Sequence, residues 1–151
     1  HHVHAAGAYG HPLITEELRR RGIDMNRELM VEVREYIYDM ALLMRAADLV
    51  ICRAGASTIS ELTALGTAAI IVPSPNVTNH HQERNAQVLA DHGAALMLME
   101  GEATAERMLQ EAEAILADDA RRRGMEENMT AVGFRDANER IYQTVVGLVR
   151  N

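Results

Sequence analysis

Short runs of apolar, β-forming residues alternate with amphipathic helical patterns along most of this chain. The apolar runs lie at residues 29–37, 49–52, 68–72 and 94–99, and helical patterns occupy residues 12–21, 40–47 and 81–92. The two middle runs are almost uninterrupted, which is typical of strands buried on both faces of a sheet. This alternation predicts an α/β fold, in which helices flank a parallel sheet.

The two ends of the chain differ in character. Beyond Thr104 the pattern is helical to the end, with breaks near Asp118 and Gly133. The front begins abruptly with three histidines in the first four residues, as though a strand were entered midway. Either these histidines are a remnant of a purification tag, or the chain is a fragment that lacks its first βα unit. We expect residues 1–151 to form a single domain.

Composition excludes several classes of function. Acidic residues outnumber basic ones by 22 to 15, which argues against nucleic acid as the main partner. The single cysteine, Cys52, lies in an apolar run and offers neither a disulfide nor a Cys-x-x-Cys metal or redox pair. No apolar segment approaches the roughly 20 residues that span a bilayer. We expect a soluble, cytoplasmic protein.

The sequence "RAGAST" follows the apolar run at residues 49–52. In a parallel α/β sheet, ligands bind beyond the carboxyl ends of the strands, where the next helix presents its unpaired amides. Gly55 would allow a tight turn there, and a helix that begins near Ser57 would present its amides and the hydroxyls of Ser57 and Thr58. This arrangement suits phosphate oxygens. Arg53 lies at the strand end, where it either reaches phosphate or pairs with neighbouring acidic groups.

Glu61 follows one turn into the same helix and is placed to accept hydrogen bonds from two vicinal hydroxyls of a sugar. A structural alternative is equally consistent with the spacing. Thr58 and Glu61 match a capping box, which many helices carry only to satisfy their first amides. The turn alone therefore does not specify a ligand.

A second polar cluster lies at the next junction between strand and helix. The run at residues 68–72 ends before a loop with two prolines, and a helix begins near His81. The polar side chains at this junction are Asn79, His80, His81, Gln82, Glu83 and Asn85. They suit the hydroxyls of a sugar, although an ordinary solvated loop with Asn79 as helix cap is the alternative. We expect no metal site, because adjacent histidines at a helix start diverge and lack companion ligands.

The stretch at residues 36–95, from "YIYDMALLMRAADLVICRAGAST" to "NHHQERNAQVLADHGAA", resembles the carboxy-terminal domain of the MurG family of glycosyltransferases. The resemblance is densest at residues 53–61 and 73–85, and it extends to the final helix, "ANERIYQTVVGLVRN". It implies the Rossmann-like half of a two-domain GT-B enzyme. That half binds UDP-N-acetylglucosamine, and it needs no cofactor or protein-bound metal.

The resemblance also implies the residues that bind the nucleotide. The backbone at Ile37 would meet the edge of the uracil ring. Ser57 and Thr58, after Gly55, would lie by the phosphates. Glu61 would hold the ribose hydroxyls.

The same resemblance places other residues near the donor sugar. Gln82 would touch the sugar and Asn85 would support the loop. His81 would also touch the sugar, although the family commonly has a glutamine at this position. Arg53 matches a basic position of the family at the strand end.

Two parts of the family pattern are not in this sequence. One is the amino-terminal domain, which binds the lipid-linked acceptor and the membrane and is expected to hold the general base; the other is a Gly-Gly-Ser phosphate loop. We therefore assign no catalytic residue. Our main hypothesis is that the chain is the donor-binding fragment of an inverting N-acetylglucosaminyltransferase of peptidoglycan synthesis. A second hypothesis is that it is a separate donor-binding subunit, which docks onto a membrane acceptor subunit. A third is that it is half of an enzyme like UDP-N-acetylglucosamine 2-epimerase. The whole transferase would lie on the cytoplasmic face of the bacterial inner membrane.

Overall fold

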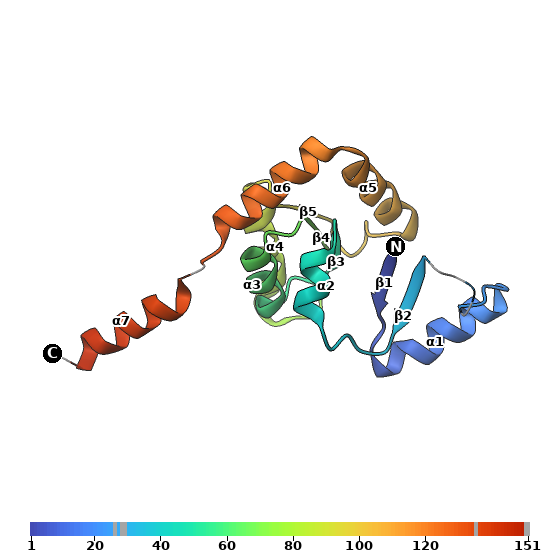
Figure 1. Ribbon diagram of the computed structural model, residues 1–151, viewed down its shortest axis with the longest axis horizontal. Coiled ribbons are helices and arrows are strands. Elements are labelled where there is room, and N and C mark those ends of the chain that lie inside the picture. Colours follow the sequence, from blue (N-terminus) through green and yellow to red (C-terminus); the bar gives the residue numbers. More distant parts are fainter. Residues whose placement is uncertain (26, 28–29, 135, 150–151) are drawn as a thin grey trace. The chain divides into compact units, whose positions relative to one another are not determined.

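A computed structural model describes residues 1–25, 27, 30–134 and 136–149 of the chain. The chain divides into two compact units, His1–Met40 and Ala41–Asn151, here called the first and the second unit. Each unit is described by itself. Figure 1 labels the helices and strands of both.

The first unit is a single strand–helix–strand motif. Its elements are β1 (His2–Ala5), α1 (Gly7–Arg20) and β2 (Val31–Arg34). The two strands pair in parallel, with His2 opposite Val31 and Ala5 opposite Arg34. β2 is shorter than the run predicted at residues 29–37, of which Leu29 lies outside the described residues.

Helix α1 begins earlier than its sequence pattern predicts. It starts at Gly7, and Pro12 lies inside the helix. The predicted start at residue 12 is wrong because proline favours the first turn but does not fix its position. The predicted end is confirmed, since Gly22 adopts a left-handed φ of 75° and its amide donates to the Arg19 carbonyl at 3.0 Å.

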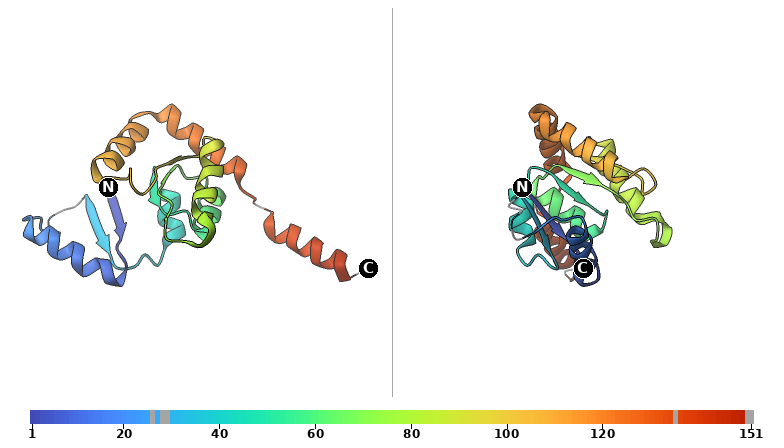
Figure 2. Two further views of the ribbon diagram at one scale, coloured as in Figure 1. Left: turned by 180° about the vertical axis from the view of Figure 1, so that it is seen from behind. Right: turned by 90° about the vertical axis from the view of Figure 1, so that its right-hand side faces the viewer.

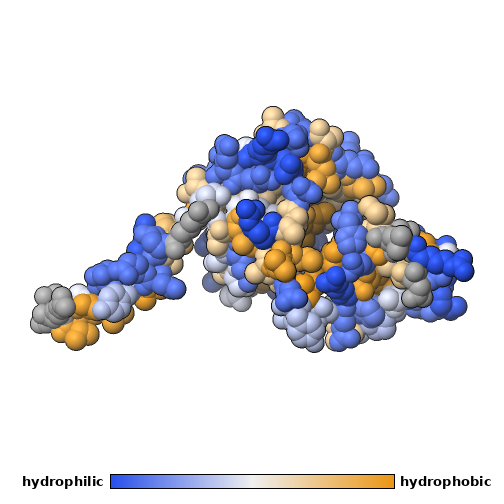
Figure 3. All heavy atoms as spheres, viewed as in Figure 1, coloured by the Kyte–Doolittle hydropathy of each residue, from blue (hydrophilic) through white to orange (hydrophobic). Residues whose placement is uncertain are grey.

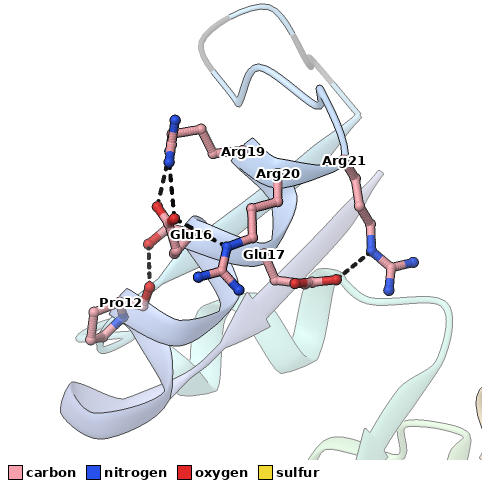
Figure 4. A network of polar contacts seen from close by, with 7 residues as sticks. Pro12, Glu16, Glu17, Arg19, Arg20 and Arg21 are labelled. Carbon is pink, nitrogen blue, oxygen red and sulfur yellow. Dashed lines mark hydrogen bonds and ion pairs between the residues drawn. The ribbon is translucent and has the colours of Figure 1, made fainter.

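The exposed face of α1 carries ion pairs spaced three and four residues apart, as Figure 4 shows. Glu16 contacts Arg19 at 2.9 Å and Arg20 at 3.2 Å. Glu17 contacts Arg21 at 2.8 Å. Exposed pairs at this spacing stabilise a helix only slightly, and they are typical of a solvated helix face.

The second unit contains a three-stranded parallel sheet in the order β3–β4–β5. Val50 lies opposite Ala69, which in turn lies opposite Ala95. The elements from the unit boundary onward are α2 (Met40–Ala46), β3 (Val50–Cys52), α3 (Ala56–Leu65), β4 (Ala69–Ile71), the 3-10 turn η1 (Thr78–His80), α4 (His81–Asp91), β5 (Ala95–Met97), α5 (Ala105–Ala117), α6 (Asp119–Val132) and α7 (Ala137–Val149). The predicted α/β class with a parallel, Rossmann-like sheet is confirmed.

Helices cover both faces of strand β4 (Figures 1 and 2). On one face Ile71 packs in a cluster with Leu62 of α3 and Leu89 of α4. On the other face Ile70 packs in a cluster with Ile115 of α5. Successive strand residues point to opposite faces, so one short strand anchors both cores. Each fully buried side chain of this kind contributes about 1.5–3 kcal/mol to folding.

Burial on both faces holds for only one of the two strands for which it was predicted. All three residues of β4 are buried. In β3, by contrast, Ile51 is 44% exposed, so the prediction is wrong there. β4 lies between two strands of its sheet, whereas β3 has a neighbour in that sheet on one side only.

Helix α7 confirms the helical prediction for the end of the chain, and it leaves apolar side chains exposed. Ile141, Val145 and Leu148 follow one stripe of the helix and are 61%, 52% and 74% exposed. Figure 3 shows hydrophobic atoms beside hydrophilic ones along this helix. None of the helices in the described part of the chain combines the length and hydrophobicity of a membrane-spanning segment.

Helices α3 and α6 approach each other closely at Gly133. A Cβ atom added at Gly133 would lie 2.8 Å from the carbonyl oxygen of Thr63 in α3. Gly133 itself has φ −77° and ψ 151°, a conformation that any residue adopts. Its lack of a side chain therefore serves the contact between the helices, not the backbone conformation.

This contact predicts that Gly133→Ala destabilises the chain by about 1–3 kcal/mol, because the added methyl group forces the two helices apart. Gly124→Ala is the matched control, since Gly124 lies inside α6 and a Cβ there meets no atom within 4 Å. The control should stabilise the chain by up to about 1 kcal/mol through helix propensity. Urea unfolding would measure both, and a Gly133→Ala variant as stable as the control would contradict the packing.

Candidate functional site

Among the described residues, the turn that follows β3 leaves three backbone amides without partners. Gly55 is the N-cap of α3, and its carbonyl accepts the first helical hydrogen bond from the Ile59 amide at 3.0 Å. The amides of Ala56, Ser57 and Thr58 precede that bond, and no residue that the structure describes accepts a hydrogen bond from them. We call residues 53–58 the β3–α3 turn. Its free amides and the helix dipole create a site that favours an anion.

Glu61 does not close a capping box. A capping box needs a serine or threonine at the N-cap, and Gly55 occupies that position without any side-chain cap. Glu61 is exposed and has neither a hydrogen bond nor an ion pair with any residue in the described ranges. Its carboxylate therefore lies one turn along the helix from Ser57, open to solvent and to a ligand.

Gly55 is not required by the backbone of this turn. It adopts φ −66° and ψ 144°, which any residue can adopt, so the turn between Cys52 and Ala56 uses no conformation that only glycine allows. A Cβ at this position would lie 3.7 Å from the Thr58 hydroxyl, which is an ordinary contact. A side chain at position 55 would thus begin beside the Thr58 hydroxyl, one of the groups predicted to lie by the phosphates.

Gln82 and Asn85, both on α4, hold the β3–α3 turn at Ala54. The Gln82 Oε1 accepts hydrogen bonds from the Ala54 amide at 3.2 Å and from the Ser74 amide at 3.0 Å. Asn85 donates from Nδ2 to the Ala54 carbonyl at 3.2 Å. The turns after β3 and β4 are therefore linked through one side chain, and only the Nε2 group of Gln82 remains for a ligand.

The second polar cluster begins with two left-handed residues. Asn79 and His80 have φ values of 57° and 51°. His80, not Asn79, is the N-cap of α4, so the alternative of an Asn79 cap is wrong. The His80 Nδ1 lies 2.9 Å from Glu83, whereas the exposed His81 donates from Nδ1 to the Thr78 carbonyl at 2.9 Å. This bond leaves the Nε2 atom of His81 as an acceptor for a ligand.

Arg53 pairs with an acidic group that the sequence pattern did not identify. Its guanidinium makes a bidentate contact with Glu100, and its Nη1 donates to the Val72 carbonyl at 3.2 Å. Of the two alternatives for Arg53, the structure contains the acidic pairing. Glu100 directly follows the apolar run that becomes β5, so its place at a strand end was the one available signal.

Ile37 and Cys52 lie outside this hydrogen-bonded arrangement. Ile37 belongs to the first unit, where its side chain is 6% exposed, and its contact with a uracil ring stays a prediction. Burial raises the pKa of the Cys52 thiol to about 11, so it is protonated at neutral pH and no nucleophile. In the described ranges, no three His, Cys, Asp or Glu side chains gather as a metal site.

Arg53, Ala56 and Ser57 of the β3–α3 turn are exposed. A hollow of about 340 Å³ occurs in the second unit, between α4 and α6, where Val88, His92 and Phe134 line it. Ser57, Thr58 and Glu61 do not line that hollow.

The Arg53–Glu100 pair predicts a dependence of stability on pH. The hydrogen bond from Arg53 is the largest cause that lowers the pKa of Glu100 below its ordinary value of 4.5. A lowered folded-state pKa stabilises the fold above about pH 4.5, and that contribution is lost as the pH falls through the folded value. Because both side chains are about half exposed, urea unfolding over a pH series should show an acid loss only slightly steeper for the wild type than for Glu100→Gln. A steeper acid loss for Glu100→Gln than for the wild type would contradict the pairing.

Comparison with known proteins identifies the family to which this chain belongs. A family model described as the glycosyltransferase family 28 C-terminal domain matches residues 4–141. The crystal structure of Acinetobacter baumannii MurG superposes with a TM-score of 0.76 at 32% identity, covering 98% of this chain and 42% of that one. The glycosyltransferase VinC, with a TM-score of 0.63 at 18% identity over 87% of this chain and 31% of that one, shares the fold.

Two curated relatives carry the same enzyme name, UDP-N-acetylglucosamine--N-acetylmuramyl-(pentapeptide) pyrophosphoryl-undecaprenol N-acetylglucosamine transferase. The one from Acetivibrio thermocellus is 42% identical over 121 residues, and the one from Bacillus cereus is 35% identical over 148 residues. These matches cover 80% and 98% of this chain, but the chain spans only 33% and 40% of the relatives' lengths. The resemblance to the MurG carboxy-terminal domain is confirmed, and the chain belongs to the glycosyltransferase family 28 C-terminal domain family.

Proposed function

We propose that this chain is the UDP-N-acetylglucosamine-binding half of an inverting glycosyltransferase. The whole enzyme would transfer N-acetylglucosamine to the lipid-linked muramoyl-pentapeptide of peptidoglycan synthesis. The observation that carries the proposal is the set of free amides at the start of α3 beside the unpaired carboxylate of Glu61. The proposed substrate is the one in the names of the relatives. Both names describe transferases, which favours sugar transfer over the 2-epimerase alternative.

The chemistry of the β3–α3 turn suits a leaving diphosphate. In an inverting displacement the acceptor oxygen attacks the anomeric carbon as the bond from that carbon to the diphosphate oxygen breaks. UDP leaves with the electron pair, so negative charge grows on its phosphates. The free amides and the hydroxyls of Ser57 and Thr58 would stabilise that charge without reorganising. The acceptor's proton would pass to a general base outside this chain.

The remaining contacts are those that the family resemblance implies. Glu61 would accept hydrogen bonds from the two ribose hydroxyls, and the backbone of Ile37 would meet the uracil edge. The Nε2 atoms of Gln82 and His81 are the ones left for the donor sugar, since their other polar atoms bond the backbone. Asn85 would act indirectly, through its bond to Ala54.

The other half of the reaction requires a partner domain. The general base and the site for the lipid-linked acceptor would belong to an amino-terminal domain, either in the same polypeptide or in a separate subunit. The whole enzyme would lie on the cytoplasmic face of the bacterial inner membrane, where its product supports cell division and cell shape. Donor binding is the role of this chain in both arrangements.

Removing the Glu61 carboxylate tests the ribose contact. Calorimetry should show that Glu61→Ala weakens UDP binding by at least about 10- to 100-fold, which is the effect of one hydrogen bond to a charged group and a lower bound for two. Binding of 2′,3′-dideoxy-UDP, which lacks both hydroxyls, should not change with the mutation. Glu113→Ala is the matched control, because Glu113 is an exposed carboxylate on α5.

Two results would count against the proposal. A wild-type chain that binds no UDP would refute donor binding altogether. Equal losses for UDP and the dideoxy nucleotide would instead remove Glu61 from the ribose contact and leave the free amides as the site.

Replacing Gln82 tests the donor-sugar contact. The carboxylate of Gln82→Glu still accepts from the Ala54 and Ser74 amides but loses the Nε2 donor. The negative charge of the new carboxylate should weaken the binding of UDP and of UDP-N-acetylglucosamine alike. The informative quantity is therefore the ratio of the two dissociation constants. We expect that ratio to shift against the sugar nucleotide by about two- to tenfold, the effect of one hydrogen bond. An unchanged ratio would remove Gln82 from the sugar.

A further inference from the structure

Arg53 connects the ends of three neighbouring strands. It follows β3, its Nη1 donates to the Val72 carbonyl at the end of β4, and its guanidinium holds Glu100 beyond β5. We propose that Glu100 is a positioning residue for the β3–α3 turn. Glu100 acts through Arg53 and thereby keeps the free amides of the turn aligned. The proposal deepens the proposed function, on which it rests.

The geometry assigns Arg53 to this connection rather than to phosphate. Both terminal nitrogens of its guanidinium already donate, one to Glu100 and to Val72 and the other to Glu100. The Glu100 carboxylate also balances the positive charge. Bidentate pairing of this kind fixes orientation as well as distance, so Arg53 is held in one position.

A fixed Arg53 restrains the backbone that leads into α3. Its neighbour Ala54 is fully buried and is held at its amide by Gln82 and at its carbonyl by Asn85. The next residue, Gly55, is the N-cap. The residues before the free amides are therefore restrained from α4 and from the loop after β5. A restrained binding turn loses less entropy when a ligand binds, which raises affinity.

The same pair contributes little to the stability of the fold. The Arg53 and Glu100 side chains are 51% and 47% exposed. Exposed pairs of this kind add little to stability at neutral pH. A variant that lacks the Glu100 charge should therefore fold, and a change in its UDP affinity would come from the turn.

The experiment compares Glu100→Gln, Arg53→Gln and the double variant in the 151-residue chain. Calorimetry with UDP and with uridine measures affinity, and NMR amide hydrogen exchange without ligand measures the order of the turn. We expect Glu100→Gln to weaken UDP binding about three- to tenfold, to leave uridine binding unchanged and to speed exchange at Ala54. When Arg53→Gln is already present, adding Glu100→Gln should not change UDP affinity or exchange at Ala54 any further. Glu102→Gln is the control, because it removes an exposed carboxylate two residues away.

Each contrary result has a distinct meaning. Tighter UDP binding by Glu100→Gln would overturn the proposal, because it would show Arg53 to be a phosphate ligand that Glu100 holds back. Unchanged exchange at Ala54, or equal losses for UDP and uridine, would overturn it as well. A wild-type chain that binds no UDP would defeat the proposed function, and amide exchange alone would then decide the role of Glu100.

Discussion

The central strand β4 is the constraint on which the second unit depends. Its side chains alternate between two cores, one shared with α3 and α4 and the other with α5 and α6. Because both faces are covered, the strand cannot shift its register without exposing one whole set of apolar side chains. The parallel neighbours β3 and β5 are thereby fixed beside it, and their carboxyl ends lie at one edge. The site is built at that edge.

Polar contacts then link the three strand ends. Gln82 joins the turns after β3 and β4, and Arg53 joins β3 and β4 to Glu100 beyond β5. These side chains satisfy backbone groups that the strands leave unpaired at their ends. The amides at the start of α3 are excluded from this network, and so is Glu61. Except for Gln82, which holds two turns through Oε1 and keeps Nε2 open, the residues that hold the site differ from the groups left open for a ligand.

Periodicity predicted most elements of this unit but not the details of the helix starts. The parallel sheet, the start of α4 at His81 and the helices after Thr104 follow from patterns of apolar residues, which burial enforces. The capping box at Thr58 was wrong. It depends on which residue becomes the N-cap, and sequence spacing does not fix that residue within one or two positions.

The sequence alone determined the class of fold, the two polar junctions and the family, because local periodicity and short motifs are encoded along the chain. Only the tertiary structure decided how side chains from different junctions pair. Arg53 and Glu100 lie 47 residues apart in sequence, and no local pattern relates them. Gln82 likewise bridges two turns through its Oε1 atom, because folding brings the Ala54 and Ser74 amides within reach of the same oxygen.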